Sequence, residues 1–350
     1  MTISEAIVPI RTPLNFVDRA LFGFPLSVSF FFLLSGYVLG HVYLRGGRDV
    51  DKRRFFAARF ARIYPLYFVM IVFDTRPLLL AEVRRYGIAA GLTKTAGVLA
   101  ASLMMLQAWS PRHLLRIDVP SWSLCAEIFF YLCFPVLGVW IWRLDGARLR
   151  MTAAVCYIGG QALVWAVRPY IHLETLLTLP LFHLSTFALG IMLARWLTLK
   201  QEQWNGAETP LWQVNAVLVL AAAGVVLSIL LLSRFHVASP YNDGLLAPVF
   251  ACFIWALSVR PTVWSRWLSA SWLVALGNAS YSLYLIHYPV LTVFLEFHWI
   301  GKGFYVLYLV LVLSLSLLSF YYFETPVRLW LLERFHSRSM ETTEEASIAQ

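Results

Sequence analysis

The feature that most constrains this chain is a series of apolar runs separated by short polar or basic segments. A helix that crosses a bilayer needs about 20 mostly apolar residues. Hydrophobic residues make up 60% of the 350 residues and charged residues only 13%, whereas a soluble domain carries about 25% charge. The sequence therefore predicts an all-α, polytopic transmembrane helix bundle, with spans at 24–44, 65–80, 120–142, 151–170, 178–199, 211–233, 244–259, 271–297 and 303–323.

The apolar piece 86–106 decides whether the bundle has about nine spans or ten. It carries Lys94 between two threonines, which suits a re-entrant or interfacial segment better than a lipid-facing helix. If it does not cross, more of the Lys and Arg residues lie on the cytoplasmic side, as the positive-inside rule requires. We therefore predict nine spans with the amino end outside, or ten if 86–106 crosses.

Polar segments flank this membrane domain, which covers 24–323. Residues 1–23 form a polar segment without the apolar run of a removable signal peptide. Residues 324–350 form a cytoplasmic tail whose acidic end is expected to be disordered. The net charge of +9 favours contact with anionic membrane lipids and control of orientation over nucleic-acid binding.

One carboxylate lies inside an otherwise uncharged span. Glu127 belongs to 120–142, and an acidic residue at the centre of a membrane helix costs about 2.5–3.5 kcal/mol on insertion scales. Ser123, Glu127 and Tyr131 are spaced four residues apart, so they share one helix face. Such an acid takes a proton from a hydroxyl or orients a base; the alternative is a structural hydrogen bond between helices.

Two arginines precede the predicted span that starts at Pro65, a residue that suits a first helical turn. Arg59 and Arg62 are three residues apart and share a face, so their guanidinium groups can bind phosphate in a forked geometry. The alternative is a role in orientation and lipid contact. Tyr64 and Tyr67 line a ligand channel or lie at headgroup level, and the sequence does not separate these.

His287 lies on the same helix face as Ser280 and Tyr284. Neutral imidazole titrates near pH 6.5 and can act as a base; the alternative is a core histidine bonded to a neighbouring helix. His172, His183, His236 and His298 have no His, Asp or Glu partner at ligand spacing, so we predict no metal site.

Five stretches in order carry a family resemblance: FFFLLSGYVLG (30–40), RRFFAARFARIYPLY (53–67), SWSLCAEIFFYL (121–132), LGNASYSLYLIHYPVL (276–291) and FETPVR (323–328). They resemble the signatures of the acyltransferase-3 family of integral membrane O-acyltransferases. The resemblance implies a multi-pass enzyme of the inner (plasma) membrane. Such an enzyme moves an acyl group, typically acetyl, from acyl-CoA to a hydroxyl of an exported or lipid-linked glycan, with no tightly bound cofactor.

The resemblance also suggests roles for individual residues. Glu127, Ser123 and His287 are the expected catalytic residues. Arg59, Arg62, Tyr64 and Tyr67 are expected to bind acyl-CoA. Ser35, Trp122, Tyr131 and Tyr284 are expected to bind substrate, although Ser35 with Gly36 and Gly40 also suits close helix packing and Trp122 also suits an interfacial anchor.

One departure from the family pattern leaves rival interpretations open. The family begins with a further helix that carries Arg and a His held to be essential, and residues 1–22 contain no apolar run and no His. We expect either a shortened start or a member that has lost its base, for which His287 is the best substitute. The rivals are a catalytically inactive relative that binds acyl-CoA and a transporter or flippase of a glycan or lipid precursor, which often shows repeats absent here.

Overall fold

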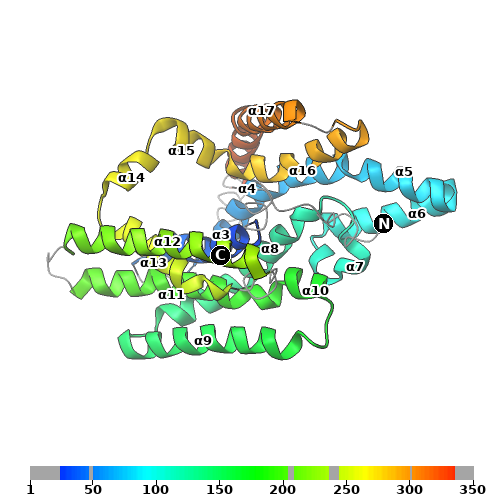
Figure 1. The fold of residues 1–350 in the computed structure, drawn as a ribbon. Helices are drawn as coiled ribbons and strands as arrows, with labels where there is room; N and C mark the ends of the chain where they lie inside the picture. Colours follow the sequence, from blue (N-terminus) through cyan, green and yellow to red (C-terminus); the bar gives the residue numbers. More distant parts are fainter. Residues whose placement is uncertain (1–23, 47–49, 204–208, 236–243, 300–301, 336–350) are drawn as a thin grey trace, which may run out of the picture. The chain divides into compact units, whose positions relative to one another are not determined.

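The computed structural model describes residues 24–46, 50–203, 209–235, 244–299 and 302–335. Within these ranges the regular structure is helical and contains no strand (Figure 1), so the predicted all-α class is confirmed. The predicted polar segment 1–23 and the predicted disordered end of the tail lie outside the described residues. The chain divides into one unit of Met1–Gly47, Trp140–Leu177 and Phe182–Thr262, and a second of Arg48–Val139, Thr178–Leu181 and Val263–Gln350.

Six described segments are long and apolar enough to cross a membrane: Ser27–Leu44, Lys52–Tyr86, Val119–Trp142, Leu173–Gln201, Leu211–Ser228 and Gly303–Phe335. Three predicted spans are not among them. The predicted span 271–297 is interrupted at Ala279, between α15 (Ser271–Asn278) and α16 (Ser280–Glu296). The predicted span 244–259 yields α13 (Ala247–Val259), which has 13 residues, and 151–170 lies largely in α9 (Gly146–Val167). A multi-pass arrangement is therefore established, and the count of nine stays a prediction.

The first unit packs α3 (Phe24–Leu39) against α11 (Pro180–Gln203) and α13, beside α9 and α12 (Leu211–Phe235). A Cβ atom placed on Gly36 would lie 2.0 Å from the carbonyl oxygen of Phe187, and one on Gly190 would lie 2.0 Å from that of Leu33. The two backbones therefore touch where only glycine fits. Close helix packing is the role that the structure gives to Gly36.

The second unit contains α4 (Lys52–Phe73), α8 (Trp122–Trp142, up to Val139), α16 and α17 (Lys302–Ser319). The expectation that a helix starts at Pro65 was wrong. The helix starts at Lys52, because the Asp51 side chain accepts a hydrogen bond from the backbone N–H of Arg54 at 3.1 Å and caps the first turn. Pro65 lies inside the helix, so Arg59 and Arg62 belong to the same helix as the residues that follow Pro65.

A helical hairpin follows α4. Its two arms are α5 (Thr75–Tyr86) and α6 (Ile88–Leu103), joined by Gly87 at φ +82° and seen in cyan in Figure 1. A Cβ atom on Gly91 would lie 2.6 Å from the Val83 backbone, so the arms touch closely. The predicted re-entrant or interfacial piece 86–106 is thus a 16-residue helix packed on α5. It is apolar but shorter than a typical span, as an interfacial segment would be.

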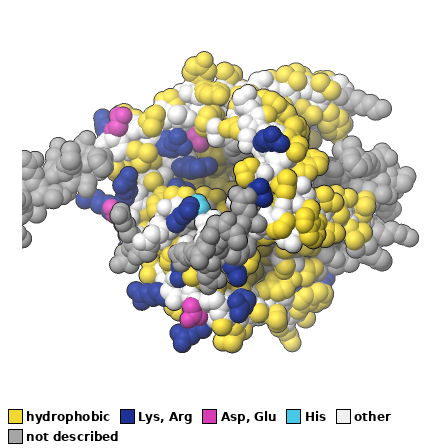
Figure 2. Space-filling view, turned by 90° about the vertical axis from the view of Figure 1, so that its left-hand side faces the viewer, with side chains coloured by type: hydrophobic (Ala, Val, Ile, Leu, Met, Phe, Trp, Pro, Cys, Tyr) yellow, Lys and Arg dark blue, Asp and Glu magenta, His cyan; other side chains and the backbone are white. Residues whose placement is uncertain are grey.

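The space-filling view in Figure 2 shows a face on which Lys and Arg side chains stand among hydrophobic ones. Large apolar side chains are exposed along many helices, for example Tyr322 at 79% and Val136 at 72%. A soluble protein does not expose apolar surface on this scale. This exposure agrees with helices that face lipid.

Candidate active site

Glu127 is buried within the second unit and lies next to two other predicted site residues. The side chain of Glu127 is on α8 and the residue is only 6% exposed. Tyr131, one turn further along, donates its hydroxyl hydrogen bond to the Glu127 carboxylate. The Arg59 guanidinium lies 5.7 Å from the centre of the Tyr131 ring. The structure therefore joins the predicted acid and one predicted phosphate-binding arginine through a single tyrosine.

A pair of hydroxyl groups lies one turn before Glu127 on the same face of α8. The Ser123 and Tyr284 hydroxyl oxygens are 2.7 Å apart, and Tyr284 also donates to the backbone carbonyl of Pro120. Ser123 is 2% exposed. Because residues four apart on a helix are about 5–6 Å apart at Cβ, this pair is adjacent to the carboxylate. Ser123, Glu127 and Tyr131 share the face that their spacing predicts, and Tyr284 from α16 completes one polar stripe with them.

His287 extends this stripe on α16. Its ring centre is 5.7 Å from that of Tyr284, and its Nδ1 lies 2.5 Å from the Tyr284 carbonyl oxygen. If Nδ1 carries the proton, Nε2 is the acceptor nitrogen and suits a base. Tyr308 donates to the His287 carbonyl at 3.0 Å, which ties α17 to this turn. The predicted shared face of Tyr284 and His287 is confirmed, while a catalytic role for His287 stays a prediction.

Arg62 does not share the surroundings of Arg59. Arg59 is half-buried and Arg62 is exposed. The positive charges of Arg62 and Arg328 act on the Glu324 carboxylate, which also accepts a hydrogen bond from Ser282 at 2.7 Å. The predicted pairing of Arg59 with Arg62 as one phosphate fork therefore stays a prediction, and Arg59 is the one that contacts the polar stripe.

Tyr64 and Tyr67 use their hydroxyl groups to hold α4 against α6. Tyr64 donates to the Leu103 carbonyl at 3.2 Å and Tyr67 to the Ser102 carbonyl at 2.6 Å. Gln107 donates to the Tyr67 oxygen at 2.9 Å and to the Ser121 hydroxyl at 3.1 Å. Sequence reasoning missed Gln107, whose buried amide binds Ser121 directly before the first residue of α8. The predicted contact of both tyrosines with CoA is untested.

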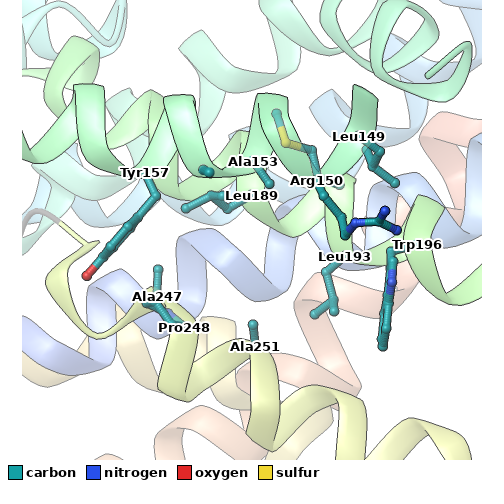
Figure 3. A pocket seen from close by; sticks show the side chains of 12 residues that line it. Leu149, Arg150, Ala153, Tyr157, Leu189, Leu193, Trp196, Ala247, Pro248 and Ala251 are labelled. Atoms are coloured by element: carbon teal, nitrogen blue, oxygen red, sulfur yellow. The ribbon is translucent and has the colours of Figure 1, made fainter. Parts of the chain in front are cut away.

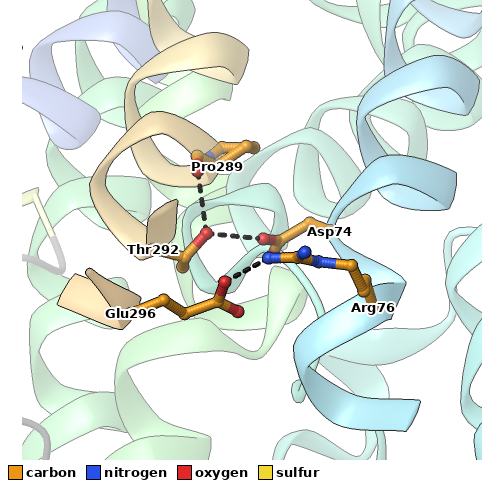
Figure 4. Close-up of polar contacts among 5 residues, drawn as sticks. All are labelled: Asp74, Arg76, Pro289, Thr292 and Glu296. Carbon is orange, nitrogen blue, oxygen red and sulfur yellow. Dashed lines mark hydrogen bonds and ion pairs between the residues drawn. The ribbon is translucent and has the colours of Figure 1, made fainter. Parts of the chain in front are cut away.

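A buried pair of acids, Asp74 and Asp118, was also missed. Asp118, which immediately precedes the span that starts at Val119, is 1% exposed, and its backbone N–H donates to Asp74 at 2.8 Å. Burial, and then the neighbouring Asp74 carboxylate, raise the pKa of Asp118 well above its usual value. Asp74 also accepts a hydrogen bond from Thr292 at 3.1 Å, beside the ion pair of Arg76 and Glu296 (Figure 4). The sequence signal that could have identified Asp118 is its position as a single acidic residue directly before an apolar run.

The two remaining predicted substrate residues have less definite surroundings. Trp122 opens α8 and is half-buried next to Ser123. Ser35 belongs to the other unit, on α3, so its contact with substrate stays a prediction.

That first unit also contains an apolar pocket of about 360 Å³ among α9, α11 and α13. Figure 3 shows Arg150 and Trp196 at one end and Tyr157 at the other. None of the predicted site residues lines this pocket.

Comparison with known proteins identifies the family. A family profile described as an acyltransferase domain matches residues 4–324, nearly the whole chain. The chain belongs to the acyltransferase-3 family. This acyltransferase is 31% identical over 285 residues to the acyltransferase MdmB of Streptomyces mycarofaciens, covering 76% of this chain and 68% of that protein.

A more distant relative carries a more specific name. The O-acetyltransferase OatA of Staphylococcus aureus is 25% identical over 337 residues, which cover 87% of this chain and 52% of OatA. The chain therefore spans about half the length of OatA, and no solved structure matches it. Together the family and the helical architecture establish a multi-pass membrane enzyme that transfers acyl groups. The resemblance inferred from five short motifs is confirmed.

Proposed function

We propose that this acyltransferase moves an acetyl group from acetyl-CoA to a hydroxyl on a sugar of an exported glycan or lipid-linked intermediate. The observation that carries the proposal is the polar stripe of Ser123, Glu127, Tyr131 and Tyr284, with Arg59 at one end. OatA supports acetyl as the group and oxygen as the acceptor by its name alone. The positive-inside rule supports a cytoplasmic donor site at Arg59 and an acceptor site nearer the outer face.

In this reaction the acceptor hydroxyl oxygen attacks the thioester carbonyl carbon. A C–O bond forms, the C–S bond breaks, and the thiol of CoA leaves with the proton that the hydroxyl gives up. In the proposed mechanism Glu127 takes that proton, or orients a base such as His287 that takes it, because a buried carboxylate adjacent to two hydroxyl groups suits general-base catalysis. Arg59 binds a phosphate of the donor in this proposal, because a guanidinium group forms charge-assisted hydrogen bonds with phosphate oxygens.

The test is transfer of label from acetyl-CoA, labelled in the acetyl group, in membranes that contain the protein and a mixture of glycan acceptors. We expect label on a glycan hydroxyl with the wild-type chain. Glu127→Gln should lower the rate about 10²- to 10⁴-fold, the usual contribution of a general base. The matched control is Asp145→Asn, which removes an exposed acid that makes no capping hydrogen bond and should leave the rate unchanged.

The other outcomes separate the rivals. Acetyl-CoA binding without transfer would identify an inactive relative, and movement of a glycan precursor without acetylation would identify a transporter. Unchanged transfer by Glu127→Gln would remove this carboxylate from the reaction. Far-UV circular dichroism of both variants in detergent distinguishes a lost base from a lost fold.

A further inference from the structure

A polar pocket of about 380 Å³ lies at the α5–α6 hairpin, within the second unit and outside the stripe described above. Four of its lining side chains are cationic, namely Arg85, Lys94, Arg112 and Arg116, and one, Glu82, is acidic. The acid is already neutralised, because Glu82 is 4% exposed and pairs with Arg116 at 2.5 Å. The pocket therefore presents a surplus of positive charge to whatever enters it.

The cations converge from three separate segments. Lys94 on α6 places its Nζ 3.2 Å from the centre of the Tyr86 ring, and Arg85 on α5 lies 5.2 Å from the same centre. Arg112, on the short helix α7 (Pro111–Leu114), is exposed at the mouth. Holding like charges together around one concavity is unfavourable unless an anion binds there. Arg and Lys donors around a cavity suit the several acceptor oxygens of a phosphate.

Exposed apolar side chains lie on α6 and in the segment that follows it, outside the lining of the pocket. Ile88 and Leu92, one turn apart on α6, are 71% and 50% exposed, and Met104 at the end of α6 is 70% exposed. Trp109, in the short 3₁₀ helix that follows (Gln107–Trp109), is 40% exposed. Exposed aliphatic side chains and a tryptophan next to cations are typical of a segment at the membrane surface. A ligand with a phosphate and an attached hydrocarbon chain suits both features, because its phosphate matches the cationic pocket and its chain matches the exposed apolar side chains nearby.

We propose that this pocket binds a phosphate group carried by an amphiphile, on the non-cytoplasmic face of the membrane that contains the protein. That phosphate belongs either to the headgroup of an anionic phospholipid or to a polyprenyl-linked sugar acceptor. The second source deepens, and rests on, the proposed function. The pocket is linked through α5 to the pair of Asp74 and Asp118, because Arg116 pairs with Glu82 near the end of α5 and the backbone N–H of Asp118 donates to Asp74 at its start. Asp74 and Glu82 are eight residues apart, which corresponds to about 12 Å along the axis of α5.

The test measures binding of defined lipids to the purified full chain by native mass spectrometry. The probes are phosphatidylglycerol and polyprenyl phosphate, each with its phosphate-free counterpart, diacylglycerol and polyprenol. The variant Lys94→Gln/Arg112→Gln removes two exposed cations from the pocket. The matched control Lys52→Gln/Arg84→Gln removes one lysine and one arginine that are exposed and do not line it. Thermal melting checks that both variants fold.

We expect the pocket variant to bind at least one phosphate probe about tenfold or more weakly than the control variant, with the phosphate-free probes unaffected. Loss for phosphatidylglycerol alone assigns the site to a lipid headgroup, and loss for polyprenyl phosphate alone assigns it to the acceptor. Equal affinity of the two variants for both phosphate probes overturns the inference. In that case acetyl transfer by the wild-type chain would still support the proposed function.

Discussion

At the scale of single residues, the site depends on side chains that share a helix face. The four-residue spacing of Ser123, Glu127 and Tyr131 predicted their common face, and the hydrogen bond from Tyr131 to Glu127 confirms it. The residue of another helix that contacts this face, Tyr284, was predictable only in part. Tyr284 was a predicted site residue, but its 2.7 Å contact with Ser123 joins residues 161 positions apart, and no local pattern specifies such a contact.

Arg59 provides a test of the donor side. Arg59→Gln removes the guanidinium while keeping a long polar side chain, so we expect the KM for acetyl-CoA to rise about tenfold, the value of one charge-assisted hydrogen bond. The kcat should change less than the KM. Steady-state kinetics with acetyl-CoA as the varied substrate measures both. Arg54→Gln, which changes an exposed side chain on the same helix, is the control, and equal KM values for the two variants would assign Arg59 to packing.

Asp118 gives a prediction about pH. Because the pKa of Asp118 is raised in the folded state, the unfolded chain releases this proton more easily. Stability is therefore lost as the pH rises from the ordinary Asp value near 3.9 through the raised pKa. Asp118→Asn removes this loss, and asparagine also tolerates the left-handed backbone at φ +43°.

We accordingly expect Asp118→Asn to melt at a higher temperature than the wild type at neutral pH, with the difference shrinking towards pH 4. Melting curves in detergent between pH 4 and pH 8 measure it, with Asp145→Asn as the exposed control. A difference that does not change with pH would contradict this account of Asp118.

At the scale of helices, close approach and capping decide where elements begin and touch. The starting point of α4 was mispredicted because Pro65 is a strong local signal, whereas the Asp51 cap and the packing of Phe55 on Phe134 at 5.2 Å extend the helix backwards. A proline inside a helix is tolerated when tertiary contacts hold the flanking turns. The apolar pattern located most helices well, but it did not show the break at Ala279 between α15 and α16.

The crossing of α3 and α11 gives a prediction about stability. Gly190→Ala would place a methyl group 2.0 Å from the Leu33 carbonyl oxygen, so the helices must separate. Overpacking of this kind typically costs about 1–3 kcal/mol, and we expect a clearly lower melting temperature in detergent. Gly97→Ala on α6 meets no atom within 4 Å and should be neutral or slightly stabilising. Equal melting of the two variants would show that α3 and α11 do not pack this closely.

At the scale of the whole molecule, composition predicted a membrane helix bundle and motif order predicted its family and enzyme class, because both are properties of the entire chain. The apolar pattern alone does not give the number of spans, since α6 and α13 are apolar helices of only 16 and 13 residues, shorter than a usual span. Length, and not apolar character, separates a span from an interfacial helix. The orientation of the hairpin therefore needs a measurement.

Arg112 distinguishes the two topologies directly. It follows α6, so it lies outside if α6 does not cross the membrane and inside if it does, whereas Arg53, at the start of α4, is cytoplasmic in both arrangements. Both side chains are exposed. With Cys125, Cys133, Cys156 and Cys252 replaced by alanine, we expect a membrane-impermeant maleimide added to intact cells to label Arg112→Cys but not Arg53→Cys. Labelling of neither before lysis and of both after it would establish that α6 crosses. That result would place the cationic pocket on the cytoplasmic side, where a lipid headgroup could reach it but an exported acceptor could not.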